Sequence, residues 1–214
     1  MFLRRSSSIQ EQVTFMPEEP TTARDPDFFI VGLQKSGTYW LTALLDAHPE
    51  IRCLPAMYGG QTGVQEGRFF DMLASIDEDG GEKFRNSFLN EHNGFYADLV
   101  PLLETASREE LYSLFRERYR ERFRRYSAGK RLIGDKTTEY VFHLEMIDDF
   151  FPQVKKICIL RDPKDRVVSW HFDQLRKGRK EEKEISDEWL RAYIEGRVKR
   201  EYEHILERCL LGNF

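Results

Sequence analysis

Cysteines are few in this sequence, and a long apolar run is absent. The three cysteines, Cys53, Cys158 and Cys209, lack the spacing of a metal site and leave an odd count. They are therefore expected to be free thiols of a reducing compartment, not a disulfide framework. No apolar stretch approaches the ~20 residues of a membrane span. The first residues also lack the apolar centre of a secretion signal, so we expect a cytoplasmic protein without a membrane span.

An excess of positive charge is also absent. Thirty-three Lys and Arg residues stand against 37 Asp and Glu residues, a net charge of −4 that argues against a nucleic-acid binder. The length of 214 residues fits one domain with a sizeable core. Residues 1–26 are polar and without periodicity, which indicates a disordered tail. Residues 27–214 are expected to form the domain. The sequence does not indicate the oligomeric state.

A strand, a glycine-bearing loop and a helix are predicted in succession over Asp27–Trp40. The apolar run Phe28–Val31 is typical of a buried parallel strand. The loop Gly32–Thr38 follows, and the helix after it repeats apolar residues on one face at Trp40, Leu41, Leu44 and Leu45. Loop N–H groups and the positive end of a helix dipole favour an anion at such a place.

Side chains of this loop add to the expected anion site. Lys35 supplies a full charge, and Ser36 and Thr38 supply hydroxyl donors, which suit a phosphate or a sulfate group. The lysine precedes Gly37 and does not follow it, so the loop departs from the nucleoside-triphosphate motif, in which lysine is followed by a metal-binding hydroxyl. A tight turn with a solvated lysine is the alternative.

Further strands and helices alternate along the chain. This pattern predicts an α/β fold in which helices cover both faces of a mostly parallel sheet. Strands are expected at Ile51–Leu54, after Lys130 and, as a second core strand, at Val154–Leu160. Helices are expected from Ser107, over about 142–151, from Pro163 with Val167, Val168, Phe172 and Leu175 inward, and over about 186–211.

The helix from Ser107 has a polar and an apolar face. Ser107 and Glu110 form a capping box. The apolar stripe comprises Leu111, Leu114, Phe115, Tyr119, Phe123 and Tyr126, and the other face carries Arg116, Arg118, Arg120, Arg122, Arg124 and Arg125. We prefer a solvated arginine face. A rim that attracts an anionic substrate is the alternative.

A second anion site is expected after the strand Val154–Leu160. Arg161 follows the strand directly, Asp162 and Pro163 suit a helix start, and Ser169 lies two turns further on. Ligands of parallel sheets bind at the carboxyl ends of strands, where both Lys35 and Arg161 fall. Two anion sites at one edge suggest a nucleotide with phosphates at both ends. A helix-capping arginine in a surface salt bridge is the alternative.

These two motifs resemble those of the sulfotransferases that use 3′-phosphoadenosine-5′-phosphosulfate (PAPS). Gln34–Trp40, QKSGTYW, is similar to the family's 5′-phosphosulfate loop, PKSGTTW, with departures at Gln34 and Tyr39. Arg161–Ser169 is similar to the 3′-phosphate motif. The resemblance spans about Asp27 to Trp170 and implies the P-loop NTPase-like architecture of that family. It implies nucleotide contacts from Lys35, Ser36, Gly37, Thr38, Tyr39, Trp40, Arg161 and Ser169.

Two shorter segments resemble the heparan-sulfate and related carbohydrate branch of the family. Gly134–Tyr140 is similar to its EKTPxY segment, which implies a substrate or cofactor contact by Lys136. Glu66–Asp71 is similar to its E-x-x-F-F-D segment, which implies that Glu66 is the catalytic base. A surface lysine and a solvated loop carboxylate are the respective alternatives.

The resemblance implies transfer of a sulfuryl group from PAPS to a hydroxyl or amine, with Lys35, Glu66 and Lys136 as catalytic residues. Adenosine 3′,5′-bisphosphate (PAP) is the implied product, no metal is needed, and the acceptor is a small molecule or a carbohydrate. A nucleotide kinase or triphosphatase is one alternative. Family members usually continue into another strand and a basic loop, whereas this sequence ends at Phe214, so a truncated, non-catalytic module is another.

Overall fold

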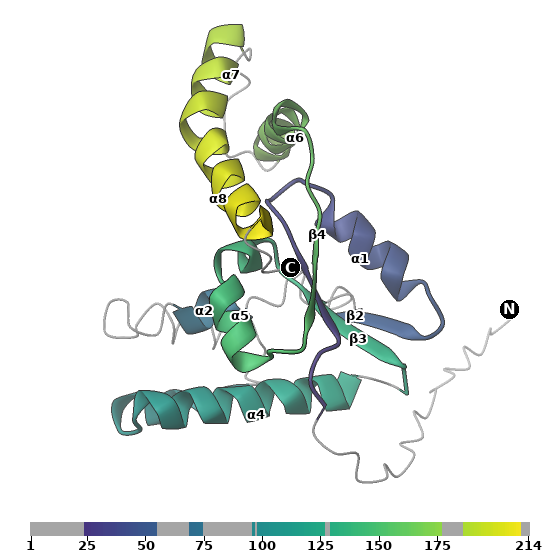
Figure 1. Ribbon diagram of the computed structural model, residues 1–214, viewed down its shortest axis with the longest axis vertical. Helices are drawn as coiled ribbons and strands as arrows, with labels where there is room; N and C mark the ends of the chain where they lie inside the picture. Colours follow the sequence, from purple (N-terminus) through teal and green to yellow (C-terminus); the bar gives the residue numbers. More distant parts are fainter. Residues whose placement is uncertain are drawn as a thin grey trace, which may run out of the picture.

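The strands that the structure describes form one parallel sheet at the centre of the molecule (Figure 1). The computed structural model describes residues 24–54, 69–74, 96, 98–126, 129–176 and 186–210. The strands are β1 (Phe28–Val31), β2 (Ile51–Leu54), β3 (Leu132–Lys136) and β4 (Lys155–Cys158), in the order β2-β3-β1-β4. The parallel α/β fold predicted from the sequence is therefore confirmed.

Alternate residues of β1 face two different layers. Phe29 and Val31 join a large core with the helices α2 (Phe69–Ala74), α4 (Arg108–Tyr126) and α5 (Leu144–Phe150). Phe28 and Ile30 join a smaller cluster against Leu41 and Leu45 of α1 (Thr38–Asp46). Helices therefore cover both faces of the sheet, as the near-continuous apolar strand sequence predicts.

Aromatic rings fill the larger core. Phe29 lies edge-on to Phe70, with ring centroids 5.5 Å apart, and Phe69 stacks on Tyr119 at 4.1 Å. All four residues are completely buried. Edge-to-face and offset pairs are the arrangements that aromatic rings prefer, so these contacts fix how α2 and α4 sit on the sheet.

Helix α4 begins with the predicted capping box. Ser107 N–H donates to Glu110 Oε2 at 2.8 Å, and Glu110 N–H donates back to Ser107 Oγ at 3.3 Å. These hydrogen bonds lower the pKa of Glu110. Its apolar stripe is buried at Leu111, Phe115, Tyr119 and Phe123, whereas Leu114 is exposed.

The arginines of α4 are mostly bound by carboxylates. Arg120 pairs with Asp25 and Glu117, and Arg118 pairs with Asp98 and Glu121. Arginines that are already paired with carboxylates favour the interpretation of a solvated face over that of a rim that attracts an anionic substrate. The prediction was wrong for Arg122, which is buried. Its side chain hydrogen-bonds Tyr96, which also lies inside the core.

Three sequence-based expectations about apolar faces were wrong. Strand β4 is shorter than expected and lies at the edge of the described sheet, with Ile157 37% exposed. On α1, Trp40 and Leu44 are exposed, whereas Leu41 and Leu45 pack against the smaller cluster. On α6 (Pro163–Arg176), Val167 is buried but Val168 and Phe172 are exposed. Helical spacing shows which residues share a face, but it does not show whether another element covers that face.

The last helical segment rises beside α6 as one long rod (Figure 1). It consists of α7 (Asp187–Tyr193), a π-helical turn at Ile194–Val198 and α8 (Lys199–Leu210). Among its described side chains, Val198 and Ile205 are completely buried. A short 3₁₀ helix precedes α4 at Val100–Glu104, and another follows β3 at Thr138–Phe142. None of the described helices is long and apolar enough to span a membrane.

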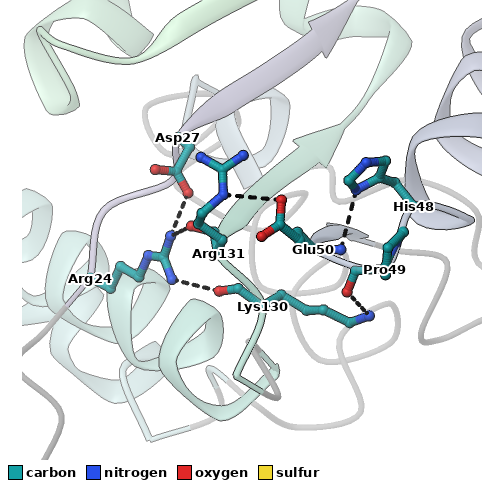
Figure 2. A network of polar contacts seen from close by, with 7 residues as sticks. All are labelled: Arg24, Asp27, His48, Pro49, Glu50, Lys130 and Arg131. Carbon is teal, nitrogen blue, oxygen red and sulfur yellow. Dashed lines mark hydrogen bonds and ion pairs between the residues drawn. The ribbon is translucent and has the colours of Figure 1, made fainter.

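A polar network ties together the amino-terminal ends of three strands (Figure 2). Arg24 donates to Lys130 O at 2.9 Å and pairs with Asp27 at 2.8 Å. Lys130 reaches Pro49 O at 2.7 Å. Arg24 and Asp25 therefore contact the domain, although they belong to the segment 1–26 that was expected to be a disordered tail. Residues 1–23 lie outside the described residues.

The structure predicts that Gly134→Ala destabilises the protein. A Cβ at Gly134 would lie 2.2 Å from a ring carbon of Phe28 on the neighbouring strand, closer than atoms can approach. Forcing the ring aside should lower the free energy of unfolding by about 1–3 kcal/mol. Urea unfolding measures the change. Gly196→Ala is the control, because a Cβ there meets no atom within 4 Å. Equal stability of the two variants would contradict this account of the strand contact.

Candidate functional site

The backbone between β1 and α1 forms an open, glycine-dependent loop. Lys35 and Gly37 have φ angles of 71° and 106°, in the left-handed region. Gly37 is the N-cap of α1 and offers no side-chain acceptor to the first helical N–H groups. Those groups have no partner within the helix and, together with the helix dipole, favour an anion at this end.

The loop lies directly against the chain that leaves β4. Ile159 N–H donates to Val31 O at 3.1 Å. A Cβ at Gly32 would lie only 2.6 Å from Ile159 O, and one at Gly37 would lie 3.3 Å from the Ile159 side chain. Only glycine at position 32 permits this approach, which brings the two sequence motifs side by side.

Two arginines of the second motif contact carbonyl groups of the loop. Arg161 Nη1 donates to Lys35 O and Arg166 Nη1 donates to Gln34 O, each at 3.4 Å. The adjacency expected for Lys35 and Arg161 is thus present. Arg161 is exposed, whereas Arg166 is buried. The sequence analysis did not select Arg166, although it lies inside the second motif.

Residues of α8 contact both of these arginines. Glu201 forms an ion pair with the Arg166 guanidinium. The Tyr202 ring lies 5.7 Å from that guanidinium, and the Tyr202 hydroxyl donates to Arg161 O. Partial burial raises the pKa of Tyr202, which keeps this hydroxyl a donor at neutral pH.

The ammonium of Lys35 is held by a buried carboxylate of α6. Lys35 Nζ lies 2.9 Å from Asp173 Oδ2, and the Asp173 side chain is 5% exposed. Arg176 Nη2 lies 2.7 Å from the other carboxylate oxygen. The sequence analysis missed Asp173. Its position one helical turn after Ser169 places both on one face of α6, but spacing alone does not show its partner.

The remaining loop residues differ in exposure. Ser36 and Thr38 are buried, and Ser36 Oγ has no hydrogen-bond partner among the described residues. Tyr39 and Trp40 are 58% and 64% exposed. On α6, Ser169 is half-buried. The Ser36 hydroxyl is thus a buried donor available to a ligand, and the rings of Tyr39 and Trp40 at the start of α1 are exposed beside it in the sequence.

Two adjacent charged residues, Asp135 and Lys136, are buried at the carboxyl end of β3. Asp135 is completely buried and accepts hydrogen bonds from the hydroxyls of Tyr119 and Tyr140. Burial, and then the charge of Asp135, raise the pKa of Tyr119 well above its usual value, so it remains a donor. Lys136 pairs in register with Ile30 and is 2% exposed. It is therefore not the surface lysine of the alternative interpretation.

The proposed base, Glu66, lies outside the described residues, and its role stays a prediction. The end of its segment is described. Phe69 and Phe70 are completely buried, and Phe69 N–H donates to the Tyr140 hydroxyl at 2.8 Å. Because Tyr140 also binds Asp135, this contact places the start of α2 beside β3 and Lys136.

The comparisons with known proteins place the chain in a family. Residues 26–210 match the model of the sulfotransferase family, so the chain belongs to that family. Among solved structures, a sulfotransferase from Alicyclobacillus acidocaldarius is similar, with 22% sequence identity and a TM-score of 0.46. The match covers 85% of this chain and 60% of that chain. No curated protein matches the sequence.

The close approach at Gly32 predicts that Gly32→Ala destabilises both the fold and the loop. The added methyl group would meet the backbone oxygen of Ile159, which cannot rotate away. Gly129→Ala is the matched control, because Gly129 also has a positive φ but a Cβ there meets no atom within 4 Å. We expect Gly32→Ala to lose at least about 1 kcal/mol more than the control in urea unfolding. A loss no larger than that of Gly129→Ala would contradict the packing argument.

Proposed function

We propose that this protein transfers a sulfuryl group from PAPS to a hydroxyl or amine of an acceptor. The observation that carries the proposal is the contact between the two motifs, in which Arg161 donates to the backbone of Lys35 at the edge of the sheet. One nucleotide with a 5′ and a 3′ anionic group could be bound by both motifs at once. Membership of the sulfotransferase family supports the same reaction class.

The residues present fit such a nucleotide. Ser36 Oγ is a buried donor without a hydrogen-bond partner among the described residues, and the first N–H groups of α1 lie under a glycine cap. With Lys35 and Thr38, these groups would hold the 5′ side. Arg161 and Ser169 would hold the 3′-phosphate, and the exposed Tyr39 and Trp40 rings offer surfaces for the base. When bound, PAPS supplies the activated sulfuryl group.

Positioning and charge stabilisation are the main contributions expected of the protein. Lys35 would neutralise the charge that develops on the leaving phosphate, as lysines do in phosphoryl transfer. Glu66 would accept the proton of the acceptor, a role that contributes about a hundred- to ten-thousand-fold in rate. The described start of α2 beside β3 is compatible with Glu66 and Lys136 serving one acceptor.

A carbohydrate is the acceptor class that we propose. The support comes from the likeness of the Glu66 and Lys136 segments to the carbohydrate branch. A lipid, a small alcohol and a peptide tyrosine are the competing acceptors. A panel of these compounds with labelled PAPS separates them, because only a true acceptor gains the label.

Calorimetric titration with PAP and with magnesium-ADP tests the nucleotide class. We expect PAP to bind and magnesium-ADP to bind at least about tenfold more weakly, because Lys35 precedes Gly37 and Asp162 caps α6 through Lys164 N–H at 2.8 Å. Preference for magnesium-ADP would favour the kinase or triphosphatase alternative. Failure of the folded chain to bind either ligand would contradict the nucleotide site and favour the non-catalytic module.

Two substitutions separate chemistry from nucleotide binding. Lys35→Ala should lower turnover of PAPS by about a hundred- to a thousand-fold, because it removes the charge at the leaving group. Arg161→Ala should mainly weaken PAP binding, by about ten- to a hundredfold. Lys199→Ala is the control, because Lys199 is exposed on α8. Steady-state rates and calorimetry measure the two effects. Normal turnover by Lys35→Ala would contradict the proposed role.

A further inference from the structure

The Asp173 carboxylate forms an ion pair with the Lys35 ammonium, and an incoming anion would need the same ammonium. We propose that Asp173 is an internal counter-ion that competes with a bound nucleotide for Lys35, and that it thereby sets the affinity of the site. The part of this inference that concerns a nucleotide rests on the proposed function. The competition for Lys35 applies to any anion that enters the loop.

The geometry makes the ion pair a defined contact. Asp173 is buried and lies 2.9 Å from Lys35 Nζ, whereas Lys35 itself is 25% exposed. A partly buried pair is screened little by salt, so the attraction between Lys35 and Asp173 persists at physiological ionic strength. An anion in the loop gains the lysine only by sharing it with Asp173 or by replacing Asp173 as its partner.

Both members of the pair can change partner without leaving a bare buried charge. Lysine has a flexible four-carbon stem and three donors, so the ammonium can turn toward the loop. Asp173 retains Arg176, which lies 2.7 Å from its other oxygen. The Arg176 side chain is 77% exposed and therefore free to follow the carboxylate. The exchange avoids the large penalty that an unpaired buried carboxylate would carry.

The test compares anion affinity in the wild type and in Asp173→Asn. The substitution keeps the shape of the side chain and removes the competing charge. We expect PAP and inorganic pyrophosphate to bind about tenfold more tightly, a change of about 1.4 kcal/mol. Asp173→Glu, which retains the charge, should stay within about threefold of the wild type. A variant that only damages the fold would weaken binding, so a gain in affinity identifies the counter-ion.

A charge control and a spectroscopic measurement complete the test. Glu203→Gln changes the net charge equally on the exposed face of α8 and should leave affinity within about twofold at physiological salt. In ¹⁵N spectra of lysine ammonium groups, the Lys35 signal, assigned with Lys35→Arg, should shift when pyrophosphate is added. The shift should not require the nucleotide.

The outcomes separate this inference from the proposed function. Tighter binding of pyrophosphate by Asp173→Asn, with no binding of PAP by any variant, would support the counter-ion and overturn the nucleotide assignment. Binding of PAP by the wild type, with equal or weaker binding by folded Asp173→Asn, would overturn the counter-ion and leave the nucleotide assignment intact. A Lys35 signal that does not respond to bound pyrophosphate would also overturn the counter-ion.

Discussion

The close approach of Gly32 to the backbone of Ile159 is the constraint on which the site depends. Because no side chain separates them, the chain leaving β4 runs directly against the loop that leaves β1. This approach places Arg161 and Arg166 within reach of the carbonyl groups of Lys35 and Gln34. Two segments that are more than a hundred residues apart in the sequence therefore meet through contacts with the loop backbone.

The two faces of the sheet support the site differently. On one face, rings such as Phe29, Phe69 and Tyr119 pack without exposed surface around Asp135. This densely packed layer fixes the carboxyl end of β3, where Lys136 lies. Beyond the end of β4, the loop is held by polar contacts from Arg161 and from Arg166 and Asp173 of α6, while Val168 and Phe172 remain exposed. Within the loop the Lys35 side chain is 25% exposed, which suits a lysine that must also bind an anion.

Local features of the fold could be predicted from the sequence, whereas features that depend on distant packing could not. The strand–loop–helix at Phe28–Asp46 and the capping box at Ser107 are set by neighbouring residues, so the pattern contains the information. Burial of Arg122 depends on Tyr96, and the Lys35–Asp173 pair joins separate motifs. The exposure of Phe172 depends on which element covers α6. Periodicity predicts a shared face, but only the assembled structure shows what that face contacts.

Cations around the loop are already bound by groups of the protein, which changes how an anion can be recognised. Lys35 is paired with Asp173, Arg166 with Glu201, and Arg161 with a backbone carbonyl. Carboxylates therefore offset two of these three cations, in a chain whose net charge is −4. Long-range attraction is then weaker than three unpaired cations would give, because opposite charges nearby cancel part of the field. Selection of the ligand then depends on geometry as well, since an anion reaches Lys35 and Arg161 together only where it spans both motifs. A nucleotide with two separated anionic groups meets that condition better than a single phosphate does.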